Sequence, residues 1–76
     1  MAKKAVVKFT GGFGSGELRD FTVGAVYHAE LPSFGELDKD GLAVRRNDEL
    51  WVVSDDAGDQ VVTNISSGFE VLWSEK

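Results

Sequence analysis

The stretch from Asp48 to Val71 alternates between short β-prone runs and polar segments that contain Asp and Gly. Residues 50–53 and 61–63 are β-branched, aliphatic or aromatic, which favours pleated, half-buried strands. Between them, Asp side chains bond their own backbone in turns, and Gly58 accepts the positive φ of a reversal. The pattern predicts a β-hairpin. Both faces of its first strand are apolar, which is typical of a central strand.

After the hairpin, residues 64–68 are too few for a helix and too polar for a strand. They predict a single tight helical turn closed by Gly68. Residues 69–73 then resume the alternation of a strand, which places Phe69, Val71 and Trp73 on one face.

The N-terminal half predicts two more strands. Residues 5–10 alternate as a half-buried strand. The region 21–31 contains a second strand, which is preceded by a turn at Val23-Gly24. Residues 34–47 form a long connection with a short extra strand through 42–44. The chain is therefore predicted to be all-β, with five to six short strands and one short helical turn before the last strand. The expected core consists of Val7, Phe9, Tyr27, Ala29, Leu50, Val52, Val61, Ile65 and Val71.

Length and composition predict a single domain over residues 1–76, with frayed ends at 1–4 and 74–76. The chain has no cysteine and no apolar run long enough to cross a bilayer, and its first residues lead us to expect no signal peptide. These features predict a cytoplasmic protein without membrane contact. We also expect a monomer or weak homo-oligomer.

The charge balance narrows the class of partner. Thirteen acidic residues against eight basic ones give a formal net charge of −5. Such a surface repels phosphate backbones, so nucleic acid is an unlikely partner and protein the expected one.

No pattern predicts catalysis, a metal or a cofactor. The Gly-rich residues 11–16 lack the lysine and helix start of a phosphate-binding loop, so we interpret them as a loop that carries Phe13. His28 and Glu30 share a strand face but form no metal set, and Gly41 stands at the wrong place for a calcium loop. The chain is therefore predicted not to be an enzyme.

The layout as a whole resembles a small Src-homology-3-like barrel. Residues 11–22 correspond to its long first loop, 32–48 to its second loop and 55–59 to its distal hairpin. Leu50-Trp51 stands where the signalling family has a tryptophan pair, and Asn64-Ile65-Ser66-Ser67-Gly68-Phe69 stands at its helical turn. The tyrosines and the proline that build that family's peptide groove are absent. The resemblance therefore implies the architecture but not that groove.

Three further segments resemble small phage and prophage accessory proteins that carry this barrel alone. They are Phe21-Thr22-Val23-Gly24-x-x-Tyr27, Asp55-Asp56-x-Gly58 and Phe69-Glu70-Val71. The resemblance implies a phage-encoded protein that acts by binding in the host cytoplasm.

Three functional hypotheses follow. The first is an adaptor or inhibitor that binds a host or phage protein through its loops, with Trp51 partly exposed on the binding face. In this hypothesis Phe13 and Phe34 contact the partner. The alternative interpretation is that both side chains fold back over the core. The second is a structural component of a phage particle. The third is an acidic mimic of DNA, for which the ordinary alternative is a set of solvated turns. The candidate partner-binding residues are Phe13, Phe34, Trp51, Asp55, Asp56 and Asp59.

Overall fold

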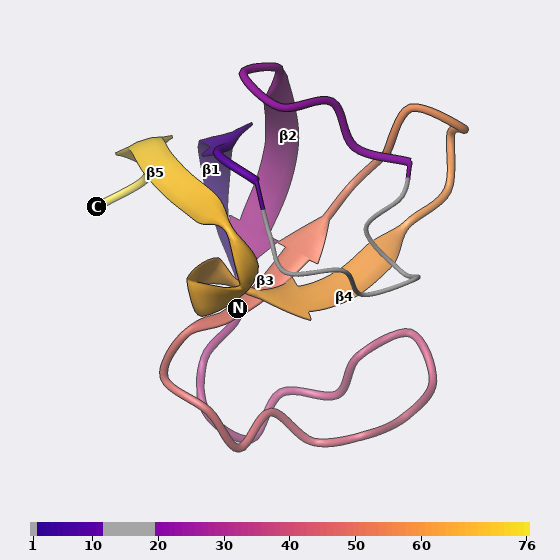
Figure 1. Ribbon diagram of the computed structural model, residues 1–76. Helices are drawn as coiled ribbons and strands as arrows, with labels where there is room; N and C mark the ends of the chain where they lie inside the picture. Colours follow the sequence, from indigo (N-terminus) through magenta and orange to yellow (C-terminus); the bar gives the residue numbers. More distant parts are fainter. Residues whose placement is uncertain (1, 12–19) are drawn as a thin grey trace.

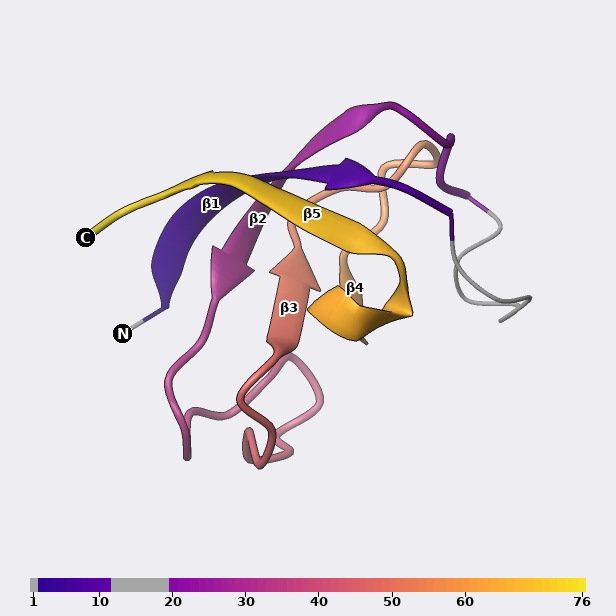
Figure 2. The same cartoon turned by 60° about the vertical axis from the view of Figure 1, so that its left-hand side comes forward.

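A computed structural model describes residues 2–11 and 20–76. The described residues form one antiparallel sheet of five strands in the order β4-β3-β2-β1-β5 (Figure 1). The sheet is strongly curved, with β1 and β5 crossing above β3 and β4 (Figure 2). The all-β prediction is confirmed, and the strand order, with a 3-10 turn before a last strand that returns to the first, is that of a small Src-homology-3-like barrel. The elements are β1 Lys3–Phe9, β2 Val26–Leu31, β3 Glu49–Val52, β4 Val61–Asn64, η2 Ile65–Ser67 and β5 Phe69–Ser74.

Aromatic rings form the centre of the core. The ring of Phe9 lies 5.4 Å from that of Phe21 and 5.2 Å from that of Phe69. The rings of Tyr27 and Phe69 lie 4.9 Å and 5.3 Å from that of Phe21, both edge-on. Such tilted and edge-on pairs are the favoured aromatic geometries. Around them pack the buried aliphatic side chains Val7, Ala29, Leu50 and Val52.

Most of the expected core is confirmed, with three differences. Val61 and Ile65 are partly buried and pack against the cluster from its edge. Val71 was expected in the core but is 36% exposed, so this prediction is wrong. Phe21 and Phe69 are buried although neither was in the expected core.

Two strand boundaries also differ from expectation. β2 begins at Val26, because residues 21–25 contain the predicted turn, in which Gly24 has a φ of 88°. β1 begins at Lys3, so Lys3 and Lys4, which were assigned to the N-terminal end outside the strands, pair with Leu31 and Glu30. The extra strand expected through 42–44 is reduced to an isolated bridge between Leu37 and Ala43. The expected fraying of Met1 lies outside the described residues.

The predicted hairpin and helical turn are both present. The hairpin connects β3 to β4, and Gly58 within it has a φ of 85°. η2 is closed by Gly68, whose N–H donates to the carbonyl of Ile65 and whose φ is 126°. A side chain with a Cβ rarely adopts such a φ, which explains a glycine at this position.

A one-residue bulge in β5 decides which side chains face the core. Val7 pairs with Val71, whereas Val6 pairs with Trp73, so Leu72 is an extra residue in β5. Because strand side chains alternate, one extra residue moves every later side chain to the opposite face. Regular alternation had predicted Trp73 on the same face as Phe69. The bulge instead places Trp73 on the outer face.

Candidate protein-binding surfaces

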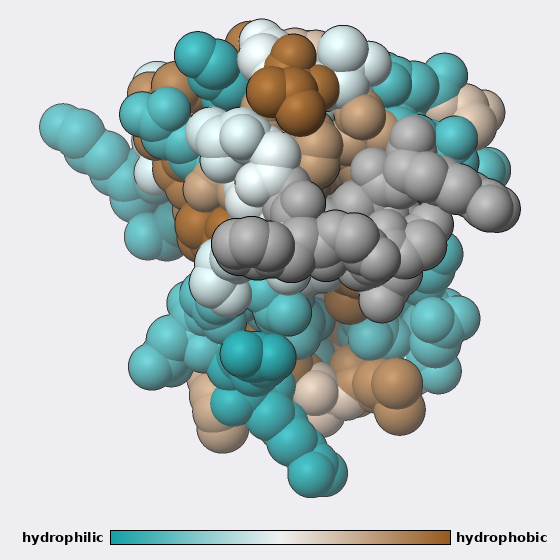
Figure 3. Space-filling view, in the orientation of Figure 1, coloured by the Kyte–Doolittle hydropathy of each residue, from teal (hydrophilic) through white to brown (hydrophobic). Residues whose placement is uncertain are grey.

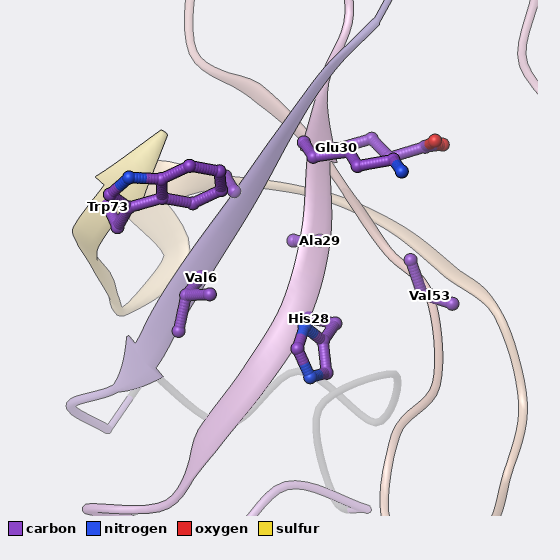
Figure 4. A pocket seen from close by; sticks show the side chains of 8 residues that line it. Val6, His28, Ala29, Glu30, Val53 and Trp73 are labelled. Carbon is purple, nitrogen blue, oxygen red and sulfur yellow. The ribbon is translucent and has the colours of Figure 1, made fainter. Parts of the chain in front are cut away.

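One row of side chains crosses the outer face of the sheet from β5 to the end of β3. Val6 pairs with Trp73 on one side and with His28 on the other. The next position is Val53, whose N–H donates to the carbonyl of His28 over 3.0 Å. Facing residues of neighbouring strands share a face, so these four side chains line up (Figure 4).

This row lines a hollow of about 460 Å³, which we call the outer-face hollow. Trp73 is 54% exposed and Val53 49%, so both walls present apolar surface to solvent. Lys4 and Glu30, which pair across β1 and β2, supply one cation and one anion. The complete lining is Lys4, Ala5, Val6, His28, Ala29, Glu30, Val53 and Trp73.

The chemistry of the outer-face hollow suits burial of an apolar group. Its volume falls within the range of roughly 300–1,000 Å³ that is typical of ligand sites. The lining contains one imidazole and one carboxylate but no Ser, Thr or Cys nucleophile. Within residues 2–11 and 20–76, no three His, Asp or Glu side chains are grouped as metal ligands. In the same part of the chain, no helix has the length and apolarity needed to span a bilayer.

A second apolar surface lies on the loop between β2 and β3. Phe34 is 74% exposed, Leu37 65% and Leu42 66%, and we call these three side chains the second-loop tip. Figure 3 shows hydrophobic side chains at the surface over this loop, at the lower right. None of the three residues lines the outer-face hollow. The two surfaces are therefore distinct.

The aromatic residues that were expected to bind a partner differ in exposure and in location. Phe34 is strongly exposed, so it does not fold back over the core. Trp51 is half-buried, as expected, and its indole N–H donates to the Glu49 carboxylate over 2.8 Å. It lies on the outer face opposite Glu30. Phe13 lies outside the described residues.

Two of the three acids proposed for binding are engaged within the fold. Asp55 is only 8% exposed, and its Oδ1 accepts the N–H groups of Ala57 and Asp59, each over 2.9 Å. Asp56 accepts the Tyr27 hydroxyl over 2.9 Å and the Thr22 hydroxyl over 2.7 Å. Asp59 is exposed. Asp55 therefore shapes the hairpin, and Asp56 ties the hairpin to the end of the first loop.

A lysine stands where the two acidic loops approach each other. Lys39 belongs to the loop that contains Asp38 and Asp40, and its Nζ donates to the carbonyl of Gln60 over 2.9 Å. Gln60 directly follows Asp59, so this cation lies between the acids of the second loop and those of the hairpin. A positive charge therefore lies next to the hairpin on the side of the second loop.

Sequence reasoning missed Trp73 and Val53 as surface residues. Trp73 was assigned to the inner face because no residue near Leu72 marks the bulge. Leu37 and Leu42 did carry a signal, since both are large apolar residues within a segment of turn-forming Asp and Gly. Comparison of the chain with protein-family models, curated proteins and solved structures finds no match.

Proposed function

We propose that this protein is a non-enzymatic binding module that holds a protein partner in the outer-face hollow. The observation that supports the proposal is the row formed by Trp73, Val6, His28 and Val53 across four strands. A half-exposed tryptophan beside aliphatic walls is the kind of residue that dominates binding energy in interfaces. A large apolar side chain that enters the hollow leaves water and gains the hydrophobic free energy of burial.

The contact is made by side chains and not by addition of a strand. β5 lies at the end of the described sheet, but its bulge at Leu72 breaks the regular spacing of backbone groups. Bulges of this kind disfavour pairing at a sheet edge. The partner segment therefore presents one or two large apolar side chains to the hollow, together with polar groups that meet Lys4 and Glu30.

We further propose, from the resemblance to phage accessory proteins, that the partner is a host or phage protein. In this proposal the module acts as an adaptor or inhibitor. We place the contact on apolar surface because Asp55 and Asp56 are already hydrogen-bonded within the fold. This choice separates the proposal from acidic mimicry of DNA, in which those carboxylates would bind the partner: Asp55 is buried, and Asp56, although exposed, already accepts two hydroxyl groups.

The test compares Trp73→Ala and Val53→Ser with the control Val26→Ser. Val26 is 55% exposed and lies on the same face, opposite Lys8, but does not line the hollow. Tagged chains are used to capture proteins from a cell lysate, and a protein captured by the wild type is then purified and titrated. We expect Trp73→Ala to weaken binding by about thirtyfold, corresponding to loss of an interface hot spot.

The control Val26→Ser should bind as the wild type does. Thermal unfolding of each variant shows whether the domain remains folded. We expect all three variants to fold, because the substituted side chains are exposed. Equal affinity of Trp73→Ala and wild type would exclude the outer-face hollow as the binding site.

A further inference from the structure

His28 is the titratable side chain within the apolar row of the outer-face hollow. It lies between Val6 on β1 and Val53 after β3 (Figure 4). The imidazole lines the hollow and is exposed to water in the free chain. An imidazole ordinarily changes its charge close to neutral pH, so the polarity at the middle of this row depends on pH.

Burial of an apolar group against His28 has a different cost for the two charge states of the imidazole. The neutral ring loses only weak hydration when water leaves the hollow, whereas the imidazolium loses the hydration of a full charge. The side chains beside it, Val6 and Val53, are aliphatic and offer no acceptor that could replace the lost water. The hollow therefore accepts an apolar group more readily when His28 is neutral.

The cations on β1 act in the same direction. Lys4 and Lys8 stand two residues before and two residues after Val6, the cross-strand partner of His28. Both lysines share the outer face with the imidazole and are its diagonal neighbours, at separations of roughly 7–8 Å. A nearby positive charge disfavours the imidazolium.

The acids of this face offer limited compensation. Glu30 lies two residues after His28 on the same face of β2 and favours the imidazolium, but it pairs across the strands with Lys4, which offsets its field. These charges are in contact with solvent, so water screens them and loss of hydration is the larger effect. The more distant acids of the outer face are Glu70 opposite Lys8, Glu75 beside Lys4 and Glu49 beside Trp51.

We propose that the outer-face hollow binds its apolar occupant selectively when His28 is neutral, so that acidification weakens the complex. This inference rests on the proposed function, because it assigns a mode of regulation to the same site. Binding and protonation are linked reciprocally. An occupant that favours the neutral imidazole therefore makes His28 harder to protonate by the same factor.

The experiment uses the full chain with 1-adamantanol as the probe, because this aliphatic alcohol carries no charge near neutral pH. An aromatic probe is avoided, since its ring would attract an imidazolium. Binding is followed by NMR at the signals of Trp73 and Val53. We expect the affinity at about pH 5 to be about three- to tenfold lower than at about pH 7.5, a range in which carboxylates stay largely ionised. Trp73→Ala should weaken probe binding at both pH values, which locates the probe in the hollow.

His28→Gln is the control, because glutamine is polar and stays neutral at both pH values. His28 is the single histidine of the chain, so the variant should bind the probe equally well at the two pH values. In the wild type, the midpoint of the His28 NMR titration should move to lower pH when 1-adamantanol is added. Thermal unfolding at each pH shows that both proteins are folded.

The outcomes separate this inference from the proposed function. Equal affinity of the wild type at the two pH values would overturn the inference and leave the outer-face hollow as a binding site. A pH dependence that persists in His28→Gln would do the same, because another group would then be responsible. Absence of probe binding at both pH values would overturn the inference together with the apolar character assigned to the hollow.

Discussion

Trp73 lies opposite Val6 on the outer face of the sheet because β5 contains one more residue than β1 between the pairs Val7–Val71 and Val6–Trp73. With regular alternation, Trp73 would share a face with Phe69 and point toward the core. The bulge thus moves the largest side chain of β5 from the core side to the wall of the outer-face hollow. A local irregularity in one edge strand creates the surface on which the proposed function rests.

Deletion of Leu72 tests this account of the bulge. Without Leu72, regular pairing places Trp73 opposite Val6 just as the bulged strand does. We therefore expect acrylamide quenching of Trp73 fluorescence to be unchanged, measured in a Trp51→Phe background so that one tryptophan reports. A Trp73 that is sheltered in the intact chain and becomes exposed on deletion would show that β5 contains no extra residue before Trp73. Leu72→Ala is the control, since it keeps the bulge.

Asp56 should contribute to stability through the two hydroxyl groups that donate to it. Asp56→Ala removes the acceptor for the Tyr27 and Thr22 hydroxyls and is expected to lower the free energy of unfolding by about 1–3 kcal/mol. The decrease is measured by urea denaturation. Asp56 and Asp59 are both exposed, but the two hydroxyl bonds are made to Asp56, so Asp59→Ala should have a much smaller effect.

A double-mutant cycle isolates the Tyr27–Asp56 bond. Tyr27→Phe deletes the hydroxyl and keeps the ring that packs on Phe21. If the effects of Tyr27→Phe and Asp56→Ala simply add, the bond does not couple the hairpin to β2.

Phe9 should be one of the costliest positions to truncate. Its side chain is 5% exposed and packs between the rings of Phe21 and Phe69. Phe9→Ala is expected to reduce the free energy of unfolding by about 3–5 kcal/mol, a large part of the stability of a small domain. Phe34→Ala removes the same ring from a position that is 74% exposed and should leave stability nearly unchanged. Chemical denaturation of both variants provides the comparison.

The bond between Ser66 and Asp48 should make stability depend on acidic pH. The Ser66 hydroxyl donates to the Asp48 carboxylate over 2.6 Å. This bond is the main reason that the pKa of Asp48 lies below its ordinary value. Burial opposes the shift, and Arg46, with its Nε at 3.6 Å, supports it. Because the pKa is lowered on folding, the stabilisation is present above the ordinary Asp pKa and disappears as the pH falls through the folded value.

Ser66→Ala should therefore raise the pKa of Asp48 in an NMR titration. It should also destabilise the domain near neutral pH and have little effect in strong acid. Ser67→Ala serves as the control from the same turn. A destabilisation by Ser66→Ala of equal size at all pH values would show that Ser66 acts independently of the charge on Asp48.

The sequence determined the all-β class, the hairpin, the helical turn at Gly68 and six of the core side chains, because these depend on local chemistry. Alternation of apolar residues places Leu50 and Val52 on one face whatever the rest of the chain does. Glycines at positions 58 and 68 identify the turns, because these positions require a positive φ.

Only the tertiary structure decided where the candidate binding surfaces lie. The face of Trp73 depends on how β5 registers against β1, a pairing between residues more than sixty positions apart that leaves no mark near Leu72. The burial of Phe21 and the role of Asp56 likewise depend on loops that meet only after folding, where the Tyr27 hydroxyl, Thr22 and the hairpin come together. Local propensity specifies which segments are strands and turns, whereas register and loop contacts specify which side chains remain at the surface to bind.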